Sequence, residues 1–173
     1  MGIIEPKEVL DAVAHPEALW TQATPQAGNG LSGTSQRRQM SDLVAYVDGG
    51  SHGNPGPSGI GVVIESPSGE TVRIAKWIGH HDNNVAEYAA LLEALQHAVE
   101  VKASSLRVYS DSEIVVKQMT GEYSCQSSRL YSLNWVCRKL ARGLKFSIAH
   151  IRRECNSEAN GLANHAVRLR LEL

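Results

Sequence analysis

The sequence predicts an α/β fold: a five-stranded mixed sheet, in which three antiparallel strands are followed by parallel additions, flanked by about four helices. Apolar residues recur with strand-like spacing in five short runs and with helical spacing in four longer ones. The runs follow the order strand, strand, strand, helix, strand, helix, helix, strand, helix. Three consecutive strands favour an antiparallel meander, and the later alternation favours parallel strands added to the same sheet, with helices on its faces.

Nine elements are expected between residues 43 and 171. The first strand is a nearly continuous apolar run, which is typical of a central strand covered on both faces. Asn83 and Asn84 are suited to cap the first helix, and Gly121 and Gly143 are suited to end the second and third. The expected strands cover residues 43–48, 60–64, 71–78, 106–110 and 146–151, and the expected helices cover residues 85–100, 112–119, 127–142 and 156–171.

Residues 1–41 differ in composition from the rest of the chain. Their first part can form a short helix, because Pro6 lies near its start and Val9, Leu10 and Val13 form a weak apolar stripe. Residues 21–41 are rich in Gln, Gly, Ser and Thr, which is typical of a linker. The segment is too short for a core of its own, so we expect an N-terminal extension over 1–41 and one domain over 42–173.

The composition is that of an ordinary globular protein, with 42% hydrophobic and 20% charged residues. No run of 18 apolar residues is present, which argues against a membrane partner, and the N-terminus lacks the pattern of a secretory signal. The three cysteines are odd in number and lack paired metal-ligand spacing, so we expect reduced thiols in the cytoplasm. A monomer is the default expectation, and Cys155 is expected to be a buried thiol.

Charge is distributed unevenly, although the net charge is only −1. Residues 42–128 contain 11 acidic and 5 basic residues, whereas residues 129–153 contain seven basic residues and no acidic one. Such asymmetry is found where an acidic metal site lies beside a basic phosphate-binding face. A solvated helix face that carries Arg and Lys explains the basic segment equally well.

Three carboxylates stand at the ends of expected elements. Asp48 closes the first strand, Asp111 closes the fourth, and Glu87 lies in the first turn of the first helix. If the first and fourth strands are parallel neighbours, Asp48 and Asp111 come close together at the edge of the sheet where sites gather. Clustered carboxylates repel one another and usually require a cation, and oxygen ligands favour Mg²⁺ or Mn²⁺. Taken singly, each acid is explained better by a turn or a helix cap.

Four segments of the chain carry recognisable motifs. They are 46–57 (YVDGGSHGNPGP), 83–91 (NNVAEYAAL), 108–112 (VYSDS) and 151–163 (IRRECNSEANGLA). In this order and at these intervals they resemble the first-strand, helix, fourth-strand and C-terminal motifs of type 1 ribonuclease H. The resemblance extends from about residue 42 to residue 171. It implies the ribonuclease H-like fold and an endonuclease that hydrolyses the RNA strand of an RNA–DNA hybrid.

Members of this family place four acidic residues around two divalent ions, Mg²⁺ or Mn²⁺. By resemblance, three of these residues are Asp48, Glu87 and Asp111, and the fourth position falls on Asn160. Glu158 is a poor substitute for it, because two residues along a helix turn a side chain by about 200°. A neutral amide leaves the site with three negative charges in place of four, so we expect one ion to bind more weakly. The asparagine is either a natural variation or a substitution that silences the enzyme.

The resemblance also implies a two-metal mechanism that leaves 5′-phosphate and 3′-hydroxyl ends. Recognition of the hybrid requires groups that read the 2′-hydroxyls of the RNA strand. By resemblance these are Asn54, Asn83 and the backbone at Gly49 and Gly50. From the residues alone, Asn54 is also an ordinary turn residue and Asn83 an ordinary cap.

Further contacts with phosphate are expected from arginines in the third helix and before the last one. The candidates are Arg129, Arg138, Arg142, Arg152 and Arg153, although plain solvation explains each of them as well. His150 belongs to the last strand, so no loop histidine is expected, and Glu154 is the nearest auxiliary candidate. An ion pair of Glu154 with Arg152 or Arg153 is the simpler interpretation. Residues 121–129 are short and nearly uncharged, so the Lys-rich handle of some family members is absent and hybrid binding should depend strongly on salt.

Three functions compete at this point. The first is an active hybrid nuclease, and the second is a catalytically silent module that binds hybrids, which Asn160 motivates. The third is another nuclease or resolvase of the same broad fold, which would prefer DNA junctions or duplexes. The motifs around Asn54 and Asn83 argue against the third.

Overall fold

The computed structural model describes residues 41–171, so the predicted extension over 1–41 lies outside the described residues except for Ser41. All nine predicted elements are present, together with a short 3-10 helix, η2 (Arg153–Cys155). The strands are β1 (Asp42–Ser51), β2 (Gly56–Glu65), β3 (Thr71–His81), β4 (Ser105–Ser110) and β5 (Lys145–His150). The helices are α2 (Asn83–Glu100), α3 (Glu113–Thr120), α4 (Ser128–Ala141) and α5 (Ser157–Leu171).

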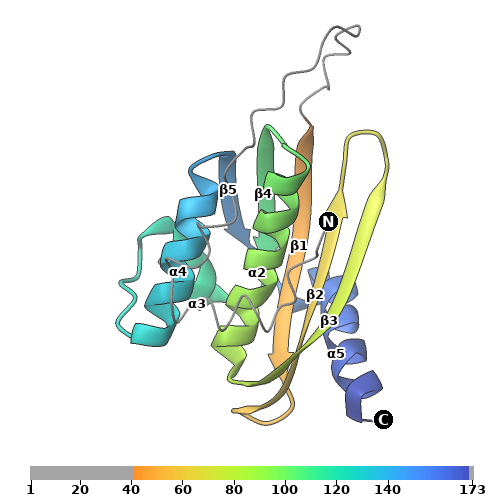
Figure 1. Cartoon of the computed structure of the whole chain (residues 1–173), viewed down its shortest axis with the longest axis vertical. Coiled ribbons are helices and arrows are strands. Elements are labelled where there is room, and N and C mark those ends of the chain that lie inside the picture. Colours follow the sequence, from red (N-terminus) through yellow and green to blue (C-terminus); the bar gives the residue numbers. More distant parts are fainter. Residues whose placement is uncertain (1–40, 172–173) are drawn as a thin grey trace, which may run out of the picture.

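The five strands form one mixed sheet in the order β3-β2-β1-β4-β5 (Figure 1). β1, β2 and β3 form the predicted antiparallel meander. β4 pairs with β1 in parallel, and β5 pairs with β4 in parallel. The predicted fold class is therefore confirmed, and the carboxyl ends of β1 and β4 lie side by side.

The helices cover the sheet in two layers. α2 packs on β1 and β2, and α4 packs on α2, which places both on one face of the sheet (Figure 1). α5 lies on the opposite face, against β2, β3 and β1. No helix among residues 41–171 is both long and apolar enough to cross a membrane.

Coverage of β1 is less complete than its apolar sequence predicts. Leu43, Ala45 and Val47 are buried, and they alternate with residues that point to the face of α5. On that face Tyr46 is only half-buried and stacks on Tyr109 of β4, with 5.3 Å between ring centroids. The expectation of cover on both faces is therefore wrong for this part of β1, because α5 lies over β2 and β3 and leaves the β4 side open.

Two predicted helix ends also differ from the structure. The cap of α2 is Asp82, whose Oδ1 accepts a hydrogen bond from the backbone N–H of Val85 at 2.9 Å, so Asn83 already belongs to the helix. α4 ends at Ala141 with Arg142 in helical conformation at its cap, and Gly143 supplies no left-handed turn there. Gly121 does end α3, with φ at 84°.

Candidate active site

Three carboxylates from three elements meet at the carboxyl end of the parallel strands. Val47 and Ser110 are the last register partners of the β1–β4 pair, so Asp48 and Asp111 lie side by side where that pairing ends. Asp48 does not close its strand as predicted, because β1 continues to Ser51 in its pairing with β2. Glu87 reaches this edge from the second turn of α2, not from the first turn as predicted, because the helix already begins at Asn83. One carboxylate oxygen from each of the three residues lies within 4.8 Å of the other two. The spacing of the three residues along the sequence could not show that they meet. The order of the strands in the sheet places them together.

Gly49 allows the start of α2 to approach β1 closely enough to place Glu87. A Cβ atom at residue 49 would lie 2.1 Å from the carbonyl oxygen of Ala86, a distance that no side chain tolerates. The backbone N–H of Gly49 donates a hydrogen bond to Oε2 of Glu87 at 3.2 Å. Helix and strand are therefore joined next to the carboxylates, and the orientation of Glu87 is set by the backbone of its neighbour.

Asn160 reaches the carboxylates from the opposite face of the sheet. Gly61, the register partner of Asp48 on β2, lets α5 come close: a Cβ there would lie 2.0 Å from the carbonyl oxygen of Ala159. Nδ2 of Asn160 donates a hydrogen bond to Oδ2 of Asp48 at 2.9 Å, and Oδ1 of Asn160 accepts one from Nδ2 of Asn164 at 3.1 Å. Asn160, the residue predicted for the fourth position, thus lies beside the three carboxylates and acts here as a donor to one of them.

Glu158 lies elsewhere, as predicted. Its side chain is half exposed and forms an ion pair with Arg73 of β3. Two residues along the helix turn the side chain by about 200°, so Glu158 points away from Asn160 and cannot supply the charge that Asn160 lacks.

Burial and mutual repulsion raise the pKa values of two of the three carboxyl groups. Burial, and then the charge of Asp111, raises the pKa of Asp48 to about 7. The pKa of Glu87 lies well above its ordinary value, first because of burial and then because of the charges of Asp48 and Asp111. Oδ2 of Asp111 is buried and has no hydrogen-bond partner among the described residues. Such a set of hard oxygen donors, with one of them unsatisfied, fits Mg²⁺ or Mn²⁺.

The predicted readers of the hybrid lie in the turn after β1 and at the start of α2. Oδ1 of Asn83 accepts a hydrogen bond from the N–H of Ser51 at 2.9 Å, and Oδ1 of Asn54 accepts one from the N–H of Asn83 at 3.1 Å. These bonds join the turn to the helix beside Glu87. Among the described residues, neither Nδ2 of Asn54 nor Nδ2 of Asn83 has a hydrogen-bond partner. Gly50 is open, since a Cβ there would meet nothing within 4 Å.

The basic residues before α5 lie beside the cluster but do not join it. The positive charge of Arg153 lowers the pKa of both Asp48 and Glu87, although burial outweighs this effect. Arg152 and Glu154 are both largely exposed, and their charged groups lie 4.0 Å apart. This contact agrees with the simpler interpretation of Glu154, and it places that carboxylate outside the three-acid cluster.

Two polar residues at the site were not predicted. Asn156 is 2% exposed, and its Nδ2 donates a hydrogen bond to the carbonyl oxygen of Val47 at 2.9 Å, which fixes the start of α5 next to Asp48. His150 lies with Nε2 at 3.2 Å from the carbonyl oxygen of Asp111. Both contacts join residues far apart in the chain, and no local pattern marks them. Cys155 is exposed, so its prediction as a buried thiol is wrong.

The comparisons with known proteins agree with this geometry. A family model described as reverse transcriptase-like matches residues 46–166. A ribonuclease HI of Halobacterium salinarum is 38% identical over 158 residues, which cover 89% of this chain and 79% of the relative. A bifunctional protein of Mycobacterium tuberculosis is 37% identical over 128 residues, but the match spans only 35% of its length.

Two solved structures extend the comparison to the fold. The crystal structure of the ribonuclease H1 of Halobacterium salinarum has a TM-score of 0.70 at 37% identity, over 73% of this chain and 98% of that one. The crystal structure of LC11-RNase H1 in complex with an RNA/DNA hybrid also has a TM-score of 0.70, at 35% identity, over 75% of this chain and 99% of that one.

The strand order, the helices on both faces and the carboxylates at the switch from β1 to β4 define a protein of the ribonuclease H-like fold class. Within that class, the identity and coverage are high enough to name the family. The chain belongs to the type 1 ribonuclease H family and is an enzyme of that family.

Proposed function

We propose that the chain is an endonuclease that hydrolyses the RNA strand of RNA–DNA hybrids with two divalent ions, Mg²⁺ or Mn²⁺, and leaves 5′-phosphate and 3′-hydroxyl ends. The observation that carries the proposal is the convergence of Asp48, Glu87 and Asp111 within 4.8 Å, with one buried oxygen of Asp111 unsatisfied. Buried carboxylates in this number are stable together only with positive charge between them. The hybrid seen with LC11-RNase H1 supports the substrate.

The four residues of the cluster would hold the ions. When bound, the ions supply a water of lowered pKa as the nucleophile and stabilise the leaving 3′ oxygen. Positive charge between Asp48 and Glu87 would favour their ionised forms, because it would offset the repulsion that contributes to their raised pKa values. The N–H of Gly49 keeps Glu87 turned toward the cluster. Asn160 offers its amide oxygen only if the amide turns, which exchanges the present bonds to Asp48 and Asn164.

Binding of the hybrid is assigned to the turn after β1, the start of α2 and the arginines before α5. The amide nitrogens of Asn54 and Asn83 and the open backbone at Gly50 are suited to reading 2′-hydroxyls in the wide minor groove of the hybrid. Arg152 and Arg153 are suited to binding phosphates, and Glu154 is the candidate auxiliary residue. A cytoplasmic location and a monomeric state stay predictions.

A catalytically silent hybrid-binding module is the second candidate. It is favoured by one observation, the hydrogen bond that Asn160 donates to Asp48, since an amide nitrogen beside a metal ligand opposes a cation. In this case the three carboxylates would bind an ion too weakly for turnover.

The test is cleavage of a hybrid labelled separately on each strand, in Mg²⁺ and in Mn²⁺, beside a DNA duplex of the same sequence. The proposal expects cuts in the RNA strand alone, with 5′-phosphate ends. Intact hybrid that is nevertheless bound would establish the silent module. Cuts in the DNA duplex would contradict both and would favour a nuclease of different specificity on the same fold.

A further inference from the structure

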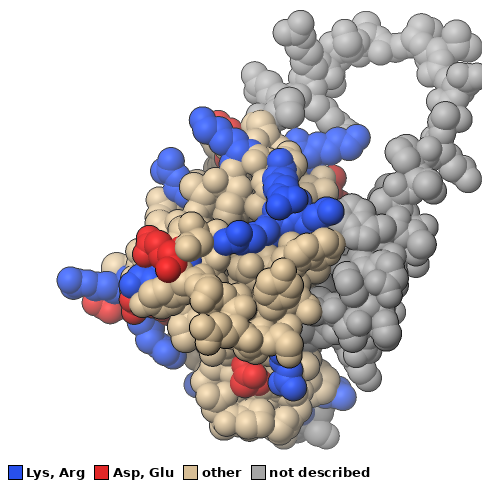
Figure 2. Space-filling view, turned by 90° about the vertical axis from the view of Figure 1, so that its left-hand side faces the viewer, with Lys and Arg blue, Asp and Glu red and all other residues tan. Residues whose placement is uncertain are grey.

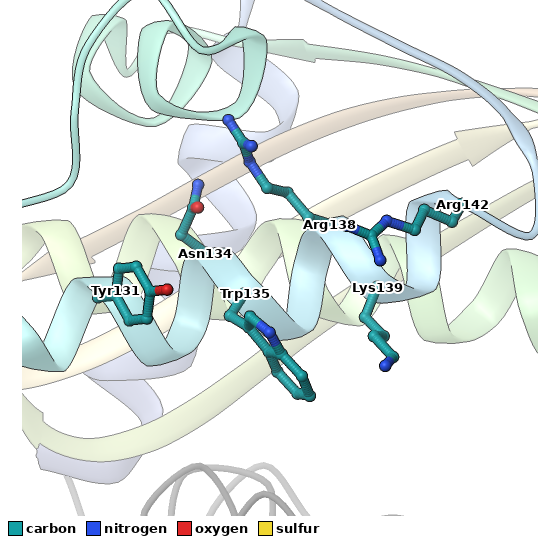
Figure 3. Close-up of a pocket in the computed structure, with 6 residues that line it drawn as sticks. All are labelled: Tyr131, Asn134, Trp135, Arg138, Lys139 and Arg142. Carbon is teal, nitrogen blue, oxygen red and sulfur yellow. The ribbon is translucent and has the colours of Figure 1, made fainter.

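The outward face of α4 carries a run of aromatic and basic side chains that the active site does not use. This α4 stripe consists of Tyr131, Trp135, Arg138, Lys139 and Arg142, spaced three or four residues apart so that all lie on one face of the helix. With Asn134 they line a hollow of about 220 Å³, shown in Figure 3. Figure 2 shows Lys and Arg gathered on this side of the molecule.

The aromatic members of the α4 stripe contribute little to the core. Tyr131 is 57% exposed and Trp135 is 37% exposed. Two large rings, one turn apart on a surface helix, leave apolar area in water that the fold does not require. Rings beside basic side chains are suited to stacking on unpaired bases, because every base presents a π-face.

Two of the three basic members, Lys139 and Arg138, have contacts that orient their side chains. Nζ of Lys139 lies 5.0 Å from the ring centroid of Trp135. Nη2 of Arg138 donates a hydrogen bond to the carbonyl oxygen of Gln118 at 2.9 Å, so one of the five guanidinium donors is used and the orientation is fixed. Between residues 129 and 153 the chain carries no acidic residue. The α4 stripe is therefore a preorganised positive surface, complementary to a phosphate backbone.

The α4 stripe begins beside the active site and leads away from it. Arg129, at the start of α4, lies with Nη1 3.6 Å from Oδ2 of Asp82, the residue that caps α2. Asn83 and Glu87 follow within the first turns of α2. From Tyr131 to Arg142 the helix rises about 16 Å. A nucleic-acid strand advances about 3.4 Å per nucleotide, so this length corresponds to about five nucleotides.

We propose that the α4 stripe binds an unpaired nucleic-acid strand that continues from the hybrid beyond the active site, its bases stacked on Tyr131 and Trp135 and its phosphates bound by Arg138, Lys139 and Arg142. The inference rests on the proposed function for the hybrid in the site. An unpaired strand fits better than a duplex, because paired bases hide the faces on which the rings would stack. The α4 stripe thus selects hybrids with a single-stranded extension.

The experiment measures binding of the full chain by fluorescence anisotropy in EDTA, so that no cleavage occurs. The probes are a blunt hybrid, the same hybrid with an oligo-dT extension of about five nucleotides at either end, and oligo-dT alone. We expect one extension to raise affinity about tenfold or more, since stacking of a single base on an aromatic ring already strengthens binding by about that factor. Trp135→Leu should remove most of this gain. Lys139→Gln with Arg142→Gln should lower the salt slope for the extended hybrid by about 1.4.

Arg107→Gln with Arg168→Gln is the matched control, because it removes the same charge from exposed positions on other elements. It should leave the gain from the extension unchanged, and equal Tm values would show that all variants fold. The proposal is overturned if an extension does not raise affinity, or if the α4 variants show the same rise in affinity as the wild type. It is also overturned if those variants lose as much affinity for the blunt hybrid as for the extended one. Capture of an acidic peptide without any response to oligo-dT would also overturn it and would assign the surface to a protein partner.

Failure of the proposed function gives a different result. If blunt hybrid is neither bound nor cleaved while oligo-dT still binds through Trp135, binding of unpaired strands by the α4 stripe is supported. The hybrid is then the wrong substrate for the active site. If blunt hybrid is bound and cleaved but the α4 variants bind oligo-dT as the wild type does, the proposed function is supported and the inference about the α4 stripe is wrong.

Discussion

The two sides of the active site are built from different chemistry. On one side β1, α2 and β4 supply Asp48, Glu87 and Asp111, which repel one another and leave a buried oxygen unsatisfied. On the other side α5 and the residue before it supply the amides of Asn156, Asn160 and Asn164, which are neutral and do not repel one another. Each forms a hydrogen bond, although the buried Oδ1 of Asn156 has no partner among the described residues. The acidic side is unstable without a cation, whereas the amide side is stable without one. The affinity for the second ion should therefore depend on the amide side.

Loss of a carboxylate from the acidic side should have the largest effect. Asp48→Asn removes the residue that contacts both sides, and hydrolysis of the hybrid should fall about a thousandfold or more, since a metal centre supplies several kcal/mol of transition-state stabilisation. Initial rates on a labelled hybrid in Mg²⁺ measure the loss. Glu100→Gln, an exposed acid at the far end of α2, is the control and should keep its rate. Equal rates for the two variants would place the chemistry elsewhere.

Adding a charge to the amide side should have the next largest effect. Asn160→Asp completes the set of four acids and should raise kcat/KM in Mg²⁺ about ten- to a hundredfold, which corresponds to about 1.4–3 kcal/mol. Asn164→Asp places the same charge one turn further along α5 and should raise it far less. A rate unchanged by Asn160→Asp would mean that the amide oxygen already serves as the fourth ligand.

The joint between β1 and α2 can be broken without touching a carboxylate. Gly49→Ala drives a methyl group into the carbonyl of Ala86, and the free energy of unfolding should fall by about 1–3 kcal/mol as α2 is displaced. Urea denaturation measures it. Gly50→Ala is the matched control, since a Cβ there meets nothing, and its stability should stay within about 0.5 kcal/mol of the wild type. A loss of the same size in both variants would point to the turn rather than to the close packing.

The pH dependence of stability should reveal the repulsion within the acidic side. Burial raises the pKa of Asp48 in the folded protein to about 7, so the folded state holds a proton that the unfolded chain releases near pH 4. Without metal, stability should fall as the pH rises from about 4 to about 7, by a few kcal/mol at most. Urea midpoints in EDTA at several pH values test this. The slope should flatten in Mg²⁺ and in Asp48→Asn, and a midpoint that rises with pH would contradict the raised pKa.

The acidic side was predictable from the sequence and the contacts of the amide side were not. Asp48 and Asp111 each follow a run of apolar strand residues, and parallel pairing of β1 with β4 brings the two together, although β1 continues beyond Asp48. Asn160 was found only through the motif, and Asn156 lies 109 residues from the carbonyl that it binds. The cap at Asp82 was missed because Asn83 and Asn84 satisfy the same local preference. Local patterns thus place element ends to within a few residues, whereas the partners of buried amides depend on packing between layers.

The measurement that tests the central claim most directly is calorimetric titration of the free protein with Mn²⁺, with Asp48→Asn beside it. If Asp48, Glu87 and Asp111 form a metal centre, the wild type should bind Mn²⁺ and release protons near pH 6, where Asp48 is still protonated. Asp48→Asn should lose both signals. Binding of the same strength in wild type and variant, or no binding by either, would contradict the assignment of a metal centre to these three carboxylates.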